Sequence, residues 1–169
     1  MTTMEPDPRL LEERALQLIG QIIVDHAPTK WKTISFSAHC TTSVSTYDLQ
    51  ITDDNSIIKR HDVPSTVYRE VDSLRRMMYR PDRGTWLSMK ITIDSTGGYE
   101  SMFDYDSLPA VDQYTPEWSN ETYALDLIEY PRPETHIPDW LRTKIANVEM
   151  NRSETTEPGH NTQQSTKGH

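Results

Sequence analysis

The stretch that decides the fold runs TWLSMKITID (residues 85–94), STGG (95–98) and YESMFDYD (99–106). From Leu87 to Asp94 apolar and polar residues alternate, which is the two-residue period of a half-buried strand, because successive side chains point to opposite sheet faces. The Gly97-Gly98 pair supplies the positive φ angles of a tight turn. The third run places aromatic residues on one face and mostly acids on the other. The sequence therefore predicts an antiparallel hairpin.

The residues before the hairpin predict a helix followed by three strands. Apolar residues at three- and four-residue spacing indicate an amphipathic helix over residues 9–27, with Asp7 as its cap and Pro28 as its end. Alternating patterns then indicate strands over 31–40, 44–52 and 57–59. Because the connections between these strands are short, we expect an antiparallel meander.

A second helix is expected over residues 65–79, with Asp62 or Ser65 as its cap. Its arginines are expected to face solvent, opposite an apolar stripe of Val67, Val71, Leu74 and Met78; these arginines are Arg69, Arg75 and Arg76. After the hairpin, Pro-rich boundaries delimit two short helices over about 121–129 and 138–148.

Together these elements predict an α+β fold: an N-terminal helix, an antiparallel β-meander, a helix, a β-hairpin that completes the sheet, and two short C-terminal helices. With 169 residues the chain is long enough for one domain and too short for two comfortable ones. We expect this domain to occupy residues 1–148. Residues 149–169 are polar and contain no aromatic side chain, so we expect them to form a disordered tail.

The acidic charge of the chain is unevenly distributed. The net charge is −9, and residues 81–147, with five Lys/Arg and twelve Asp/Glu, carry −7 of it. A negative surface repels the phosphate backbone of nucleic acids, so we expect no direct nucleic-acid partner. The more natural alternatives are a basic protein surface or no partner at all.

Several features favour a cytoplasmic protein without a membrane partner. Cys40 is the only cysteine, so no intramolecular disulfide can form. Residues 1–8 lack the basic-then-apolar pattern of a signal peptide, and no apolar run approaches the ~20 residues of a membrane span.

No catalytic motif is found. The histidines show no metal-ligand spacing, and His39 and Cys40, being adjacent in a strand, point to opposite faces. We therefore expect no catalytic residue, metal or cofactor. One cluster leaves three interpretations open: Asp94, Asp104 and Asp106 are polar-face residues, an acidic docking surface, or a metal or acid–base site to which Asp94 would contribute across the hairpin.

The hairpin also resembles a known family. Residues 86–93, the Gly97-Gly98 turn and FDYDSLP (103–109) are similar to the central signature of the YezG-like immunity proteins, antitoxins that bacteria pair with secreted polymorphic toxins. The resemblance covers about a quarter of the chain and extends to Trp118 and Tyr123. It implies a protein that is not an enzyme and that binds a cognate toxin inside the producing cell, blocking its active site.

Charge and expected exposure suggest which residues would contact that toxin: Trp86, Asp104, Asp106, Asp112 and Glu117. Many such toxins are nucleases with basic grooves, so a nuclease is favoured and an NAD-degrading toxin is the alternative. For Trp86 a second interpretation is that a helix covers it. Two other classes of protein stay open: a small metal-dependent enzyme using the Asp94/Asp104/Asp106 face, and a structural module that forms a homodimer through an edge of the sheet.

Overall fold

The computed structural model of the protein describes residues 7–110 and 116–155. Its elements, in chain order, are α1 (Pro8–His26), β1 (Thr33–Cys40), β2 (Ser45–Thr52), β3 (Ile58–His61), α2 (Ser65–Met77), β4 (Ser88–Asp94), β5 (Tyr99–Asp104), α3 (Asn120–Glu129), a short 3-10 helix η1 (Glu134–His136) and α4 (Asp139–Thr155). The predicted α+β order of helix, meander, helix, hairpin and C-terminal helices is confirmed.

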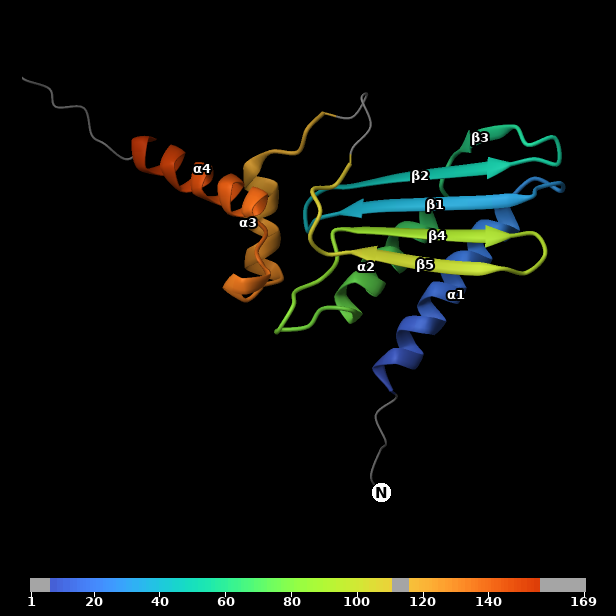
Figure 1. Ribbon diagram of the computed structural model, residues 1–169, viewed down its shortest axis with the longest axis horizontal. Helices are drawn as coiled ribbons and strands as arrows, with labels where there is room; N and C mark the ends of the chain where they lie inside the picture. The colour runs from blue at the N-terminus through green and yellow to red at the C-terminus, as the bar shows by residue number, and fades with distance from the viewer. Residues whose placement is uncertain (1–6, 111–115, 156–169) are drawn as a thin grey trace, which may run out of the picture.

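The strands form one antiparallel sheet in the order β3-β2-β1-β4-β5. The hairpin completes the sheet by pairing β4 with β1. Figure 1 shows α1 and α2 on one side of the sheet and α3 and α4 beyond the end where β1 finishes and β4 starts. None of the described helices lies on the opposite side of the sheet, which is the polar side: Ser37 and His39 of β1 lie there next to Asp48 and Lys90.

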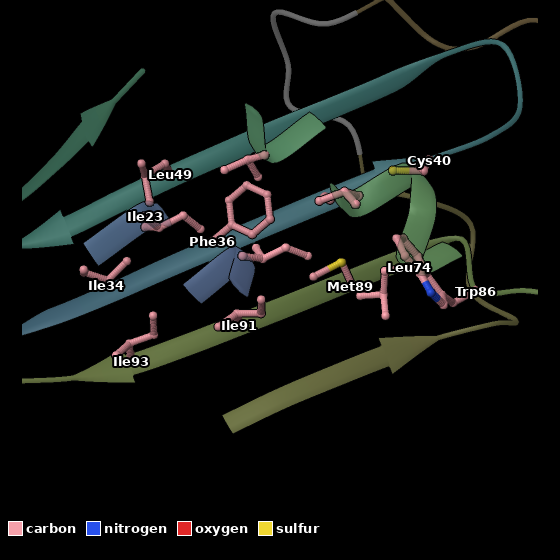
Figure 2. Close-up of a cluster of buried hydrophobic side chains, with 14 of the residues drawn as sticks. Ile23, Ile34, Phe36, Cys40, Leu49, Leu74, Trp86, Met89, Ile91 and Ile93 are labelled. Carbon is pink, nitrogen blue, oxygen red and sulfur yellow. The ribbon is translucent and has the colours of Figure 1, made fainter. Parts of the chain in front are cut away.

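The core lies between the sheet and the helices α1 and α2 (Figure 2). Phe36 at its centre is fully buried, and so are Ile23 of α1 and Leu74 of α2. The alternation that predicted the strands is confirmed in β1 and β4, where every second side chain is buried. Burial of these apolar side chains, at ~25 cal/mol per Å² of apolar area, is the main force that holds the helices on the sheet.

The helix boundaries follow the local sequence in α1 but not in α2. The Asp7 side chain accepts a hydrogen bond from the backbone N–H of Arg9 at 3.0 Å, and the helix ends at His26, two residues before Pro28. The expectation that Asp62 or Ser65 caps α2 is wrong, because Pro64 stands at the cap position. Its side chain has no hydrogen-bond acceptor, so the helix has no side-chain cap.

β4 begins at Ser88, one residue after the start of the alternation at Leu87. Leu87 N–H donates to the carbonyl of Asp104 at 2.8 Å, although Ser88 is the register partner of Asp104. Two residues of one strand therefore oppose one residue of the other, which is a β-bulge. The bulge interrupts the alternation of side chains, so residues before Ser88 do not continue the faces of β4.

The C-terminal helices are held around a second, smaller cluster of buried side chains, formed by Trp118, Tyr123 and Leu141. Ser119 caps α3 by accepting from Thr122 N–H. α4 runs to Thr155, so the expectation of a short last helix and a disordered tail from residue 149 is wrong for residues 149–155. Residues 156–169 of the predicted tail lie outside the described residues. Within residues 7–110 and 116–155, no helix has the length and apolar character needed to cross a membrane.

Candidate partner-binding surface

Trp86, proposed as an exposed anchor, is fully buried, so the assignment of this side chain to the toxin-binding surface is wrong. Its ring lies 5.7 Å from the ring of Phe103, and the Arg75 guanidinium lies over it at 5.9 Å. The bulge at Leu87 explains the error, because it turns Trp86 from the polar face of the strand into the core. The second interpretation, a helix over the polar face, is right about burial only: Trp86 lies in the main core, and none of the described helices covers the polar face of the sheet.

Asp104 is the last residue of β5, and Asp106, expected on the same strand, lies in the turn that follows. The Asp104 carboxylate accepts hydrogen bonds from the backbone N–H groups of Asp106 and Ser107, both at 2.9 Å. These bonds, chiefly that of Ser107, lower the pKa of Asp104. The side chain of Asp106 is 66% exposed and lies 3.5 Å from Arg132. Asp104 therefore shapes the turn, while the Asp106 carboxylate is largely exposed to solvent.

Glu117 is presented in the same region of the molecule. Its side chain is 75% exposed and receives Lys144 Nζ at 2.9 Å. One turn of α4 away, Trp140 Nε1 donates to the carbonyl of Asp106 at 2.7 Å. Because residues four apart lie on one face of a helix, α4 brings Asp106 and Glu117 to the same side of the molecule. Asp112, the remaining candidate, lies outside the described residues.

The register of the hairpin separates the carboxylates of the predicted metal site. Asp104 is opposite Ser88, at the start of β4, whereas Asp94 is its last residue, about 20 Å further along the strand. The expectation that Asp94 approaches Asp104 and Asp106 across the hairpin is therefore wrong. Asp94 instead accepts hydrogen bonds from Thr96, which lower its pKa. Across the two described ranges, no three His, Cys, Asp or Glu side chains are grouped so as to hold a metal ion.

A buried ion pair positions the helices that carry this surface. Arg75 of α2, expected on the solvent side, is only 2% exposed, so that expectation is wrong. Its two terminal nitrogens donate to the two carboxylate oxygens of Asp126 at 2.9 and 2.8 Å, and its Nε donates to the carbonyl of Trp86 at 2.8 Å. Asp126 also accepts from the backbone N–H and hydroxyl of Thr42. The Asp126 carboxylate of α3 is thus bonded both to Arg75 of α2 and to Thr42 in the β1–β2 turn.

The sequence contained a signal for this pair that was not used. Val67, Val71 and Arg75 follow one another at four-residue spacing, so Arg75 falls on the buried stripe of α2. Asp126 likewise follows the buried Tyr123 by three residues in α3. A charged residue on each of two apolar stripes is the pattern of a buried ion pair, because neither charge is stable in the interior alone.

Arg132 attaches the acidic turn to the end of the sheet. Its side chain is 3% exposed, and its terminal nitrogens donate to the carbonyls of Tyr105 at 2.6 Å and Thr85 at 2.8 Å. Burial lowers the pKa of this guanidinium, and Asp106 partly opposes that effect. Two hydrogen bonds therefore hold the turn that contains Asp106. Arg132 donates to the carbonyl of Tyr105, and Trp140 donates to the carbonyl of Asp106.

The helix-free face of the sheet carries one arrangement that could do chemistry. His39 Nδ1 lies 2.8 Å from the Ser88 hydroxyl, and two hollows of about 440 and 390 Å³ share Ser37 and His39. Burial lowers the pKa of His39, with Asp48 opposing. In the described part of the chain no hydrogen bond orients the second ring nitrogen, as a catalytic triad would require. Cys40 points into the core, where burial raises its pKa to about 11.

Comparison with protein families and with curated sequences identified no relative of this chain. No protein-family model matches the chain, and no curated protein sequence matches it.

Proposed function

We propose that the protein is an immunity protein that binds and neutralises a cognate toxin, with Asp104, Asp106 and Glu117 in the binding surface. The observation that carries the proposal is the placement of Asp106 and Glu117 on one side of α4, exposed and held by fixed neighbours. Preorganised acids lose little side-chain entropy on binding, so such a surface suits a tight protein complex.

The charge of the surface points to the class of toxin. Residues 81–147 carry a net −7. Among their acids, Asp106 and Glu117 are exposed beside α4, whereas Asp94 lies at the other end of β4 and Asp126 is buried in its pair with Arg75. An acidic surface accelerates association with a basic groove and competes with its nucleic-acid substrate. A nuclease domain is therefore the favoured partner, ahead of an NAD-degrading toxin, and the proposed place of action is the cytoplasm of the producing cell.

The resemblance to the YezG-like immunity proteins supports the same proposal. Its matching residues include β4, the Gly97-Gly98 turn, and the segment 103–109 that contains the acidic turn. Trp118 and Tyr123, where the resemblance extends, pack against each other with ring centroids 6.0 Å apart in the second cluster. The resembling positions thus belong to the hairpin and to the helices that flank the proposed surface.

The test is co-expression of the tagged full chain with the toxin domain encoded beside it. We expect recovery of the two proteins in equal amounts and loss of the toxin's activity. The double variant Asp106→Lys/Glu117→Lys should slow association at least about tenfold at low salt, because it reverses two charges in the steering surface.

The matched control for this test is Asp54→Lys, an exposed acid in the β2–β3 turn at the far end of the sheet. It changes net charge by the same amount per site but leaves the proposed surface intact, so its association rate should stay within about twofold of the wild type. Equal binding by the double variant and the wild type would rule out this surface. A wild-type chain that neither binds nor silences the toxin would rule out the function.

A further inference from the structure

β5 is an edge strand whose free side faces solvent. Within residues 7–110 and 116–155 it pairs with β4 alone, and it ends the strand order of the sheet. Edge strands present unpaired backbone donors and acceptors, which another chain can use. Two of its side chains are large, apolar and well exposed, Tyr99 at 44% and Met102 at 61%.

The register shows which backbone groups are free. Asp94 N–H donates to the carbonyl of Gly98 at 2.8 Å, and hydrogen-bonded pairs recur at every second residue of an antiparallel ladder. Glu100, Met102 and Asp104 therefore direct their N–H and C=O groups toward β4. The groups of the intervening residues, Tyr99, Ser101 and Phe103, point away from the sheet.

A groove with an apolar floor and a polar rim runs beneath this free edge. It has a volume of about 750 Å³ and lies between α1 and β5, with Leu16 and Val24 on one side and Tyr99 and Phe103 on the other. The α1 wall also carries polar side chains: Arg9, Glu12, Glu13, Gln17 and Gln21. α1 comes closest to β5 at Gly20, where an added Cβ would lie 3.3 Å from the Tyr99 ring. Figure 1 shows that the N-terminal half of α1 continues past the β5 edge, so the helix forms a shelf beside the free strand.

We propose that the β5 edge accepts an extended segment of the partner protein as a sixth strand. Backbone hydrogen bonds would form with Tyr99, Ser101 and Phe103, and alternate side chains of the incoming strand would enter the α1–β5 groove. This inference rests on the proposed function, because the cognate toxin is the partner that supplies the strand. It names a second contact, separate from Asp106 and Glu117.

Charge selects the kind of strand. From Tyr99 to Asp106 the chain contains three acids and no Lys or Arg. Glu100 and Asp104 lie on the helix-free face, since both pair with outward-facing residues of β4. Opposite charges facing each other across two strands stabilise a pair, so the incoming strand should carry Lys or Arg opposite these acids and apolar residues between them. A second copy of this chain would bring an equally acidic strand, which disfavours a β5–β5 dimer.

The test uses a proline that blocks only the free side of β5. In Ser101→Pro the lost N–H is one that points away from β4, and edge strands tolerate proline at such positions. We expect the dissociation constant for the cognate toxin domain to rise at least about tenfold, since one backbone bond is lost and the ring obstructs its neighbours. Ser101→Ala removes the hydroxyl but keeps the N–H, so it should bind like the wild type.

Amide hydrogen exchange of the complex gives a second readout. The N–H groups of Ser101 and Phe103 should exchange quickly in the free protein and slowly in the complex, whereas those of Glu100 and Met102 should be slow in both. If the melting curve showed that Ser101→Pro does not fold, two other measurements would test the sixth strand. These are the exchange rates of the four amides and the binding of Glu100→Lys, which should be weaker than that of the wild type.

The outcomes separate this inference from the proposed function. Wild-type affinity in Ser101→Pro, with fast exchange at Ser101 in the complex, would overturn the sixth strand and leave the immunity function standing. A free chain that is a dimer, and that Ser101→Pro converts to a monomer, would show that a second copy occupies the edge and would also overturn it. Failure of the wild type to bind the toxin would overturn both.

Discussion

At the scale of single residues, Asp126 illustrates how a buried charge is tolerated. Its two oxygens accept hydrogen bonds from Arg75 and from the backbone and hydroxyl of Thr42. Replacing both members of such a pair by apolar residues is often neutral, but removing one leaves the other charge uncompensated.

Asp126→Asn should therefore destabilise the fold by about 3–5 kcal/mol, because the amide places an N–H₂ donor and no charge opposite Arg75. Urea unfolding at pH 7 measures the change. Asp54→Asn, at an exposed turn, should shift the free energy of unfolding by less than ~0.5 kcal/mol. A loss below about 1 kcal/mol in Asp126→Asn would mean that the pair is not isolated from water.

His39 should make stability depend on pH in a defined window. Its pKa in the folded state is lowered from 6.5 by burial, so the unfolded chain binds the proton more readily. Stability should therefore fall as the pH drops below 6.5 and should be complete above it. His39→Gln should have a flatter curve between about pH 5 and 7, measured by urea unfolding at each pH. Parallel curves for variant and wild type would contradict this assignment.

At the scale of elements, the sequence predicted what depends on local pattern. Side-chain period, the turn glycine Gly97 and the Asp7 cap identified α1, β1, β2, β4 and β5, because each is determined by neighbouring residues. The expectation of a positive φ at Gly98 is wrong, since of the two turn glycines Gly97 alone has one, at +101°. The bulge before Ser88 depends on a hydrogen bond between Leu87 and Asp104, residues that only the pairing of two strands brings together. The burial of Trp86, and hence its removal from the candidate surface, could not be predicted without that bond.

The same limit applied to the acids of the candidate surface. The sequence predicts Asp104 and Asp106 as acids on the polar face of a strand, but their different roles depend on local bonds to Ser107 and on distant contacts with Arg132 and Trp140. The link between Asp106 and Glu117 through α4 joins segments that no periodicity relates.

Gly84, in the loop between α2 and β4, and Gly97, in the hairpin turn, allow the cost of a steric clash to be separated from the cost of backbone strain. Gly84 has φ +87°, and a Cβ there would lie 2.5 Å from Arg132 Cγ. Gly97 has φ +101° with nothing within 4 Å. Gly97→Ala should lose about 1–2 kcal/mol from strain alone, and Gly84→Ala should lose more, because Arg132 must also leave the carbonyls of Tyr105 and Thr85. Equal losses by thermal unfolding would show that Arg132 moves without cost.

At the scale of the whole molecule, the two clusters of buried side chains should differ in stability. The main core joins α1, α2 and the sheet, whereas Trp118, Tyr123 and Leu141 form a small cluster of their own. Regions with few buried apolar contacts open at lower free energy. Amides of α3 and α4 should therefore exchange with solvent faster than those of β1 and β4 in native-state hydrogen exchange. Exchange of both groups at one common free energy would contradict two separately opening parts.

The strand order also has a consequence for how the chain folds. β1, β2 and β3 are consecutive, and so are β4 and β5, but the central contact between β1 and β4 joins residues such as His39 and Ser88 that are 49 positions apart. Pairing β1 with β4 is slow, because the chain loses the entropy of closing the long connection before the contacts between the two strands form. The meander and the hairpin should therefore form early and meet late. Until they meet, the apolar sides of both are open to other chains, so the synthesis of this protein is most exposed to aggregation while β4 is emerging.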